Sequence, residues 1–330
     1  MRKHSFVIST NATNLYKTLD PLLKSISAAV QESGEGFSSE VIVVVNKPLN
    51  RSEELSPPTN IGLPLRVVHE GAIGLVFARH KGFRASNSDL ITFLDDDVQI
   101  SPSYFWGLKE LPCTSILLAG GNVLPYWEEC PPQFIYDLYS LGIGGYKAIP
   151  SLTILEVGHD PCYIDPMYIW GCNFTVSREL LLKANGFHPD AFPPQQLHLR
   201  GDGETHIARI CASLKGYSYF HPALTVMHNV PKARMSLQYL RKRWFAEGVS
   251  ASYLSVRGNG IDVNSDISVF NLNELYQQII MKAGNGPLKF NSEIKSLLDL
   301  EHQNGYAWHR KCVAENPWLI KWCRLTTYGL

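Results

Sequence analysis

The chain has 330 residues, of which 45% are hydrophobic and 18% charged, and its 30 basic and 30 acidic side chains give a formal net charge of zero. This balance excludes a broad electrostatic attraction to nucleic acid, so an anionic ligand must be met by local groups. No apolar stretch reaches the length of a membrane span, and the short apolar run near the start does not fit a signal peptide. The seven cysteines are scattered without a CxxC pair, which favours reduced thiols. We therefore expect a cytoplasmic protein without a transmembrane segment, whereas peripheral contact with a membrane surface and the oligomeric state stay open.

The first 120 residues alternate short apolar runs with helical patterns. Strands are predicted at 5–9, 41–45, 65–68, 90–94 and 116–119, because each is a short, mainly apolar run rich in β-forming residues. Apolar residues at helical spacing predict helices within 15–30 and 74–85. Strands and helices in this order predict an α/β fold with a parallel sheet and right-handed crossovers.

The pattern changes after this part. Residues 123–158 are rich in Pro, Gly and Tyr and are predicted to be irregular. Helices are predicted to start at Ser177 and near Glu204, and a strand at 224–227 is predicted to end in His228. Beyond residue 236 the pattern is mainly helical. A Gly-Asn-Gly hinge at 258–260 divides the prediction into a first domain, 1–257, and a helical appendage, 258–330.

Residues 90–98 read LITFLDDDV, an apolar run that leads directly into Asp95, Asp96 and Asp97. Such a run is typical of a buried strand, and the end of that strand is where open α/β sheets place their ligand crevice. Three neighbouring carboxylates repel one another unless something positive neutralises them. A divalent cation that also holds a phosphate would do so. The alternative is an acidic turn that caps the next element, and both interpretations stay open at this point.

Further motifs, each weak alone, follow one another in a fixed order. They are VIST at 7–10, EVIVVVN at 40–46, GLVFARHKG at 74–82, DDD at 95–97, GNVLP at 121–125, GCN at 171–173, GF at 186–187, GET at 203–205, GY at 216–217 and PALTVMH at 222–228. In this order they resemble the family 2 glycosyltransferases, over residues 6–251. The resemblance implies a single Rossmann-like nucleotide-binding sheet of the glycosyltransferase A type, flanked by helices.

The resemblance also implies an activity and its residues. Such an enzyme, here of hexosyltransferase type, moves a sugar from a nucleotide diphospho-sugar to a hydroxyl acceptor, with a UDP-sugar as first choice and Mn²⁺ or Mg²⁺ as cofactor. Asp97, in the DXD-type triplet, and His228 would bind the metal. The donor would contact Thr10, Asn46, Arg79, Asp95, Asp96 and Arg243, and the sugar and acceptor subsites would include Trp170, Gly171 and Asn173.

Two acidic residues compete for the role of catalytic base. The family's Glu-Asp pair appears here as Glu204-Thr205, with Asp202 two residues upstream. The dipole at a helix N-terminus stabilises a carboxylate, so Glu204 and Asp202 both fit the role. A base on the face opposite the leaving group implies inversion at the anomeric carbon. Two other departures from the family pattern are Asn46, in place of Asp, and His80, in place of Asn.

Two alternatives to this function stay open. The departures at Asn46 and Thr205 also fit a degenerate protein that binds a nucleotide-sugar or a glycan without turning it over. A sugar-nucleotide pyrophosphorylase uses a comparable sheet with acidic metal ligands. However, the loop after the first strand, STNATN at 9–14, lacks the Gly, Arg and Lys that such enzymes carry there.

Overall fold

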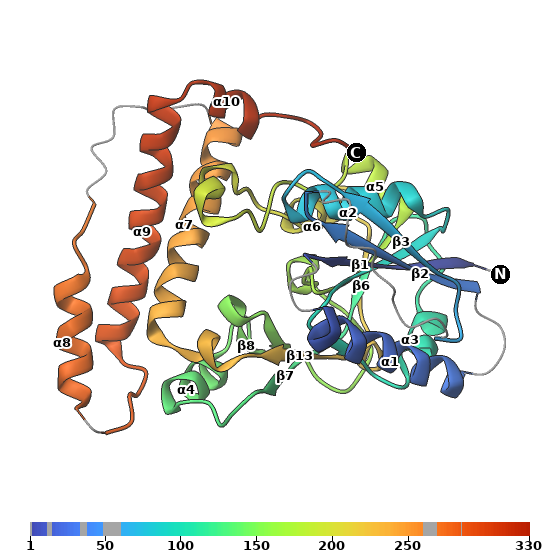
Figure 1. Cartoon of the computed structure of the whole chain (residues 1–330), viewed down its shortest axis with the longest axis horizontal. Coiled ribbons are helices and arrows are strands. Elements are labelled where there is room, and N and C mark those ends of the chain that lie inside the picture. The colour runs from blue at the N-terminus through green and yellow to red at the C-terminus, as the bar shows by residue number, and fades with distance from the viewer. Residues whose placement is uncertain (1, 12–14, 34–37, 49–60, 260–268, 285) are drawn as a thin grey trace.

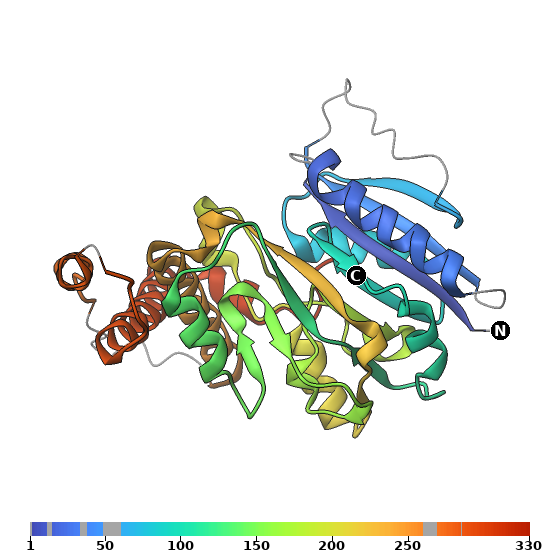
Figure 2. The same ribbon diagram turned by 90° about the horizontal axis from the view of Figure 1, so that it is seen from below.

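The computed structural model describes residues 2–11, 15–33, 38–48, 61–259, 269–284 and 286–330. They form an α/β part and a group of helices beside it, which Figures 1 and 2 show from two directions. The α-helices are α1 (Leu15–Ser33), α2 (Leu75–Ala85), α3 (Tyr104–Glu110), α4 (Gln133–Leu141), α5 (Arg178–Lys183), α6 (Thr205–Ser213), α7 (Leu237–Asn259), α8 (Asn273–Ala283), α9 (Ser292–Glu315) and α10 (Trp318–Cys323). Short 3-10 helices are η1 (Pro150–Leu152), η2 (Pro166–Tyr168), η3 (Pro194–Leu199), η4 (Pro222–Leu224) and η5 (Lys232–Met235).

The larger sheet is the predicted central sheet. It consists of β1 (Lys3–Thr10), β2 (Ser38–Asn46), β3 (Leu65–Glu70), β4 (Leu90–Asp95), β6 (Leu117–Gly120), β10 (Cys162–Tyr163), β11 (Asn173–Ser177) and β12 (Tyr217–Phe220). Their order is β10-β12-β6-β11-β4-β1-β2-β3, in which β3, β2, β1 and β4 are parallel and β11 is antiparallel to both neighbours. The predicted α/β class with helices around a central sheet is confirmed.

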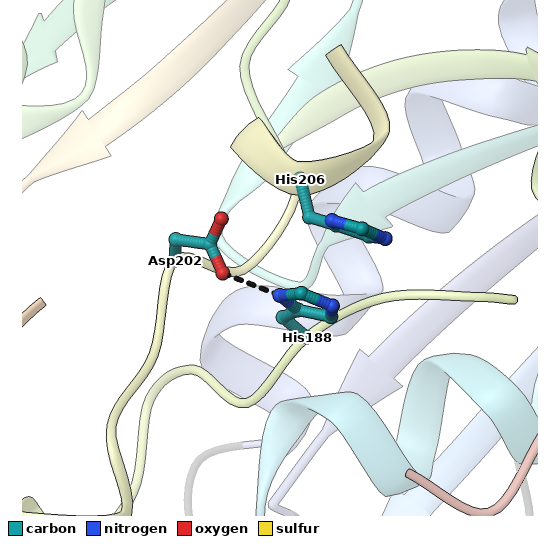
Figure 3. Close-up of side chains that lie close together, drawn as sticks. All are labelled: His188, Asp202 and His206. Atoms are coloured by element: carbon teal, nitrogen blue, oxygen red, sulfur yellow. Dashed lines mark hydrogen bonds and ion pairs between the residues drawn. The ribbon is translucent and has the colours of Figure 1, made fainter. Parts of the chain in front are cut away.

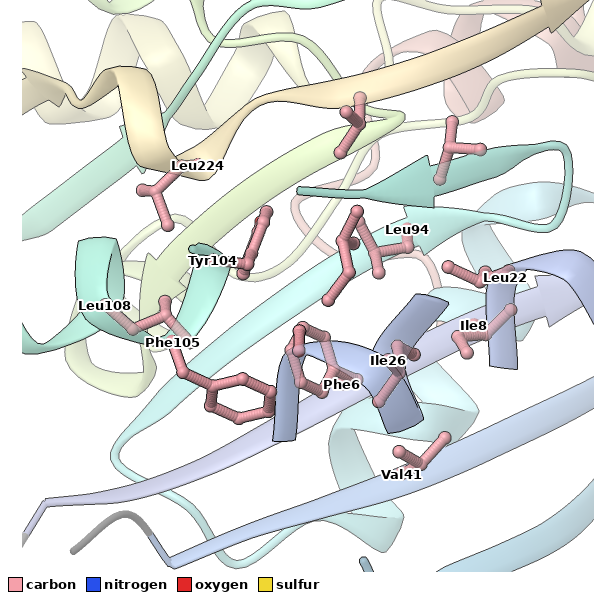
Figure 4. Close-up of a cluster of buried hydrophobic side chains, with 14 of the residues drawn as sticks. Phe6, Ile8, Leu22, Ile26, Val41, Leu94, Tyr104, Phe105, Leu108 and Leu224 are labelled. Atoms are coloured by element: carbon pink, nitrogen blue, oxygen red, sulfur yellow. The ribbon is translucent and has the colours of Figure 1, made fainter. Parts of the chain in front are cut away.

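Helices cover both faces of this sheet, which explains why its strands are nearly continuous apolar runs. In β1, Phe6 and Ile8 pack with Leu22 and Ile26 of α1 and with residues of α3 (Figure 4). Val7, between them, belongs to a second buried cluster on the opposite face, to which α2, α5 and α6 contribute. Alternating residues of one strand therefore fill two cores.

A second sheet lies beside the first. It contains β5 (Val98–Ile100), β7 (Val123–Trp127), β8 (Lys147–Ile149), β9 (Ile154–Glu156) and β13 (Val226–Val230), in the order β5-β13-β7-β9-β8. The prediction that residues 123–158 are irregular is therefore wrong, because they form three of these strands and α4. The strands are too short for a periodic pattern to show in the sequence, and β7 pairs with β13, which comes from a distant segment.

The C-terminal region is helical, as predicted. Helix α7 packs along α9, and a Cβ atom added at Gly248 or Gly305 would lie 1.9 Å from a backbone oxygen of the other helix, so these glycines allow the close approach. The predicted boundary at 257/258 stays a prediction. Helix α7 runs across this boundary to Asn259, so Gly258 and Asn259 of the predicted hinge are helical, and α7 packs on α9. In the part of the chain that is described, no helix is long and apolar enough to cross a membrane.

Candidate active site

The acidic triplet lies where the two sheets meet. Asp95 is the last residue of β4 in the larger sheet, and Asp96 and Asp97 form the turn to β5 of the smaller sheet. Thr10 ends the neighbouring strand β1, and its Oγ1 donates to Asp96 Oδ2 at 2.6 Å. The predicted position of the triplet, at the end of a buried parallel strand, is confirmed.

His228 and Arg234 complete the surroundings of Asp97. Strand β13 pairs with β5 so that His228 opposes Val98, and this register places His228 Nε2 3.5 Å from Asp97 Oδ1. Arg234, in η5, lies with Nη2 3.2 Å from Asp97 Oδ2 and Nη1 3.3 Å from His228 Nε2. Because arginine only donates, His228 Nε2 is the acceptor. A carboxylate oxygen and an imidazole nitrogen lone pair therefore converge on one positive charge.

Two details of this group differ from the prediction. His228 does not end its strand, because β13 extends to Val230 and places His228 at its centre. Arg234 was not predicted at all, although a buried acidic triplet requires a positive partner. The basic residues of the loop that follows His228 are the only local signal for it, and they do not specify which carboxylate they meet.

The three carboxylates have different electrostatic surroundings. Burial raises the pKa of Asp95 to about 6, although the nearby Arg79 acts to lower it. Burial also raises the pKa of Asp96, against the hydrogen bond from Thr10. Burial acts in the same direction on Asp97, but His228 with a protonated ring, together with the positive charge of Arg234, outweighs burial and lowers the pKa of that carboxyl. Asp97 therefore retains its negative charge most readily, as a metal ligand must.

Arg79 and Glu204 form a second group on the other side of Asp95. Arg79, on α2 and only 3% exposed, has Nη2 3.6 Å from Asp95 Oδ1 and Nη1 3.4 Å from Glu204 Oε2. Its Nη2 donates to the carbonyl oxygen of Gly171 at 2.9 Å, while Gly171 N donates to Glu204 Oε1 at 3.0 Å. The guanidinium also lies 5.0 Å from the ring centroid of Phe187. Glu204, which directly precedes α6, is thus held at a fixed place next to the triplet.

Gly171 is required by this packing. A Cβ atom added there would lie 2.6 Å from Arg79 Nη2 and 2.8 Å from Glu204 Cδ. We expect Gly171→Ala to separate the two side chains and to lower the free energy of unfolding by about 1–3 kcal/mol, the usual cost of overpacking. Urea denaturation measures this change. Gly71→Ala is the matched control, because nothing lies within 4 Å of its added Cβ, and equal effects of both substitutions would contradict the prediction.

Asp202 belongs to a different cluster (Figure 3). Its Oδ1 lies 2.6 Å from His188 Nδ1, and its other oxygen is paired with Arg209. The rings of His188 and His206 are stacked, with centroids 3.5 Å apart and an interplanar angle of 12°. The three side chains offer possible metal ligands within 4.8 Å of one another. However, imidazole lone pairs lie in the ring planes, and two nearly parallel planes do not meet at one ion. The arrangement fits a hydrogen-bonded network better than a metal site.

The remaining predicted residues occupy separate places. Asn46 Nδ2 donates to the carbonyl oxygen of Ala72 at 2.6 Å and its Oδ1 accepts from Gly74 N at 3.0 Å, so its amide braces the loop before α2. Asn173 is 1% exposed, and its amide bonds Tyr104 and the backbone of Leu224. Trp170 is half-buried, with Nε1 donating to Met167 O at 3.1 Å. Arg243, on α7, pairs with Glu247 at 3.1 Å.

A cavity of about 500 Å³ adjoins Asp97. It lies between α1, β5, β7 and β13 and is lined in part by Gln99, Tyr126, Trp127, Glu128 and Asn229. Among the residues that the structure describes, its lining contains carboxylate, amide and aromatic groups and no Lys or Arg. This chemistry suits a neutral ligand with hydroxyl groups better than a phosphate.

Comparisons with known proteins agree with the sequence resemblance. The model of the family described as Glycosyl transferase family 2 matches residues 5–108, so the predicted resemblance is confirmed for this segment, which contains Arg79 and the acidic triplet. A search of curated proteins found no match. Among solved structures, the chain is similar to a mannosyltransferase from Pyrobaculum calidifontis in complex with GDP-Man and Mn²⁺, with 15% identity, a TM-score of 0.48 and coverage of 96% of this chain and 76% of that chain. It is also similar to glucosyl-3-phosphoglycerate synthase from Mycobacterium tuberculosis in complex with Mg²⁺ and uridine-diphosphate, with 16% identity, a TM-score of 0.40 and coverage of 75% and 78%.

Proposed function

We propose that this chain, which carries a family 2 glycosyltransferase segment over residues 5–108, transfers a sugar from a nucleotide diphospho-sugar to a hydroxyl acceptor with a divalent cation bound. One observation carries the proposal. The acidic turn at the end of β4 has a cation-binding donor set, Asp97 with His228, on one side and a positioned carboxylate, Glu204, on the other. Metal-assisted departure of a diphosphate and removal of a proton need these two functions next to each other.

The residues around Asp97 fit a divalent cation. The Asp97 carboxylate and His228 Nε2 converge on the guanidinium of Arg234, so the protein already places a positive charge at this point. A mixed oxygen and nitrogen donor set suits Mn²⁺ better than Mg²⁺, which prefers oxygen ligands. Asp97 and His228 would hold the cation, which supplies Lewis-acid neutralisation of the departing diphosphate. Arg234 would then be free to bond the diphosphate oxygens, for which guanidinium geometry is well suited.

Glu204 fits the role of general base better than Asp202. One oxygen of Glu204 faces Arg79 and the other accepts from Gly171 N, so the carboxylate is oriented next to the triplet. The Asp202 carboxylate is already paired with His188 and Arg209 in a separate cluster. A base that deprotonates the acceptor on the face opposite the diphosphate gives inversion. The cavity beside Asp97, whose described lining includes aromatic, amide and carboxylate groups, suits a sugar ring.

Metal-dependent binding of a nucleotide tests this proposal. We expect UDP or GDP with Mn²⁺ to raise the melting temperature, since a ligand at 100 times its Kd stabilises by about 2.7 kcal/mol. Asp97→Ala should abolish the shift because it removes the oxygen ligand. Asp160→Ala, at an exposed position, is the matched control and should retain the shift. A shift of equal size in Asp97→Ala, or without any metal, would contradict the assignment of Asp97.

A further inference from the structure

Residues 325–330 leave the helical region and return to the α/β part. Figure 1 shows this segment crossing from α10 toward α2 and α5. Tyr328 is 3% exposed and packs in the same buried cluster as Phe187 and Val76. The side chain of Tyr328 bonds Tyr253 and the backbone of Trp322, and its backbone carbonyl oxygen bonds His80. The side-chain and the backbone contacts lead to Glu204 and to Arg79 by separate routes.

The first route starts at the Tyr328 hydroxyl. This group donates to the carbonyl oxygen of Trp322 at 2.6 Å and lies 2.7 Å from the hydroxyl of Tyr253 on α7. Because the Tyr328 proton is committed to that carbonyl, Tyr253 is the donor between the two hydroxyls. The Tyr253 oxygen lies 3.3 Å from His188 Nδ1, which in turn lies 2.6 Å from Asp202 Oδ1.

Asp202 is connected to Glu204 through backbone hydrogen bonds. Both the amide and the hydroxyl of Thr205 donate to the carbonyl oxygen of Asp202, at 3.0 and 2.7 Å. Gly203, between Asp202 and Glu204, has a φ of 53° and donates to Pro189 O at 3.3 Å. The tight turn at Gly203 therefore fixes where Glu204 leaves the chain.

The second route starts at the Tyr328 carbonyl oxygen. It lies 3.2 Å from Nδ1 of His80, which follows Arg79 on α2. The amide of Phe187 donates to His80 Nε2 at 2.8 Å, so the proton of a neutral His80 is on Nδ1 and points at Tyr328. Phe187 in turn supports the guanidinium of Arg79 through its ring. Tyr328 therefore bonds to His80, and His80 holds the backbone of Phe187, whose ring contacts the guanidinium of Arg79.

We infer that Tyr328 is a positioning residue that fixes Glu204 through its hydroxyl and Arg79 through its carbonyl oxygen. The C-terminal segment then completes the active site rather than only covering the fold. The catalytic consequence rests on the proposed function, whereas the physical coupling between Tyr328 and the two site residues does not. The physical coupling and its catalytic consequence can therefore be tested separately.

The test compares three variants with the unchanged full chain by hydrogen–deuterium exchange. Tyr328→Phe removes the hydroxyl route and leaves the carbonyl route in place. Deletion of residues 328–330 removes both routes. Tyr306→Phe is the matched control, because its hydroxyl makes one hydrogen bond, to Ser255 at 3.1 Å, within the helical region and away from the site. Peptides covering 183–187 and 202–206 report the carbonyl route and the hydroxyl route, respectively, and a peptide from β1 reports global opening.

In Tyr328→Phe, we expect exchange in 202–206 to rise about tenfold, the effect of losing one hydrogen bond, with little change in 183–187. The deletion should raise exchange in both peptides, and Tyr306→Phe in neither. Equal changes in the β1 peptide and in 202–206, or the same result for Tyr328→Phe and Tyr306→Phe, would overturn the inference. If the protein shows no nucleotide binding but the exchange pattern holds, the coupling stands and the proposed function fails.

If the nucleotide binds, a second measurement separates positioning from folding. Release of UDP from UDP-glucose with Mn²⁺ should fall about tenfold in kcat for Tyr328→Phe, because Glu204 is misplaced. The Kd of UDP with Mn²⁺ should stay unchanged, since the hydroxyl of Tyr328 is connected to Glu204 and not to Asp97. A weaker Kd with unchanged kcat would contradict the assigned role. GDP-mannose is used in the same way if GDP is the nucleotide that binds.

Discussion

Glu204→Gln is expected to lower turnover by about 10²- to 10⁴-fold while the donor still binds, because the effect of removing a general base lies in this range. Glutamine has nearly the same shape and can still accept a hydrogen bond from Gly171 N through its amide oxygen. It no longer accepts a proton, and it loses the ion pair with Arg79. Release of UDP or GDP from its sugar nucleotide, measured with acceptor hydroxyl compounds present, gives kcat. The thermal shift with nucleotide and Mn²⁺ gives binding.

Asp202→Asn is the matched comparison for this experiment. It removes one charge at a position two residues away from Glu204. We expect its main effect to be a lower free energy of unfolding, because the Asp202 carboxylate pairs with His188 and Arg209, while kcat changes little. An inactive Asp202→Asn beside an active Glu204→Gln would assign the base to Asp202 instead. Donor binding with no turnover by the unchanged chain under any acceptor condition would favour the non-catalytic alternative.

The sequence predicts this site as far as local patterns reach. The run LITFL is short, apolar and followed directly by Asp95, so the strand and the position of the triplet at its end follow from burial and periodicity. The contact between Asp97 and His228 depends on the pairing of β5 with β13. That pairing joins segments far apart in the sequence, and no local pattern specifies its register. Arg234 was missed for the same reason.

The choice between Glu204 and Asp202 shows a second limit. Both carboxylates lie at the start of the same helix, and helix-dipole reasoning treats them alike. The positive φ of Gly203 turns the chain between them, so Glu204 faces Arg79 and Asp202 faces His188. A glycine in the sequence permits such a turn but does not specify it. The direction of each side chain is therefore decided by the packing around the turn.

Acidification is expected to unfold the protein well above the pH at which carboxylates are normally protonated. Burial lowers the pKa of His4 and His188 to about 3 and that of His80, His206 and His309 to about 4. In the unfolded chain these rings have the ordinary value of about 6.5. Between pH 6.5 and about 4 the unfolded state therefore binds more protons than the folded state, and stability falls as the pH falls.

The size of this effect is comparable to the whole stability of a protein. Each such histidine costs at most about 1.4 kcal/mol per pH unit, and half of that at pH 6.5, so five of them together cost roughly 8 kcal/mol between pH 6.5 and 5. Burial raises the pKa of Asp95 to about 6, so protonation of its folded form acts in the opposite direction below that pH. One carboxyl offsets only a small part of five imidazoles. Since domains are stable by about 5–15 kcal/mol, we expect cooperative unfolding between about pH 6 and 4.5.

Urea denaturation followed by circular dichroism at a series of pH values between 8 and 5 measures this dependence. The slope of the unfolding free energy against pH gives the number of protons taken up on unfolding. His309→Gln is the matched variant: its ring is buried on the C-terminal helices, with Nδ1 2.8 Å from Ser252 Oγ, outside the candidate site. It should reduce the proton uptake by about one, because glutamine does not titrate. A free energy of unfolding that stays constant from pH 6.5 to 5 would contradict the prediction. It would show that the imidazole rings bind the same number of protons in the folded and the unfolded protein.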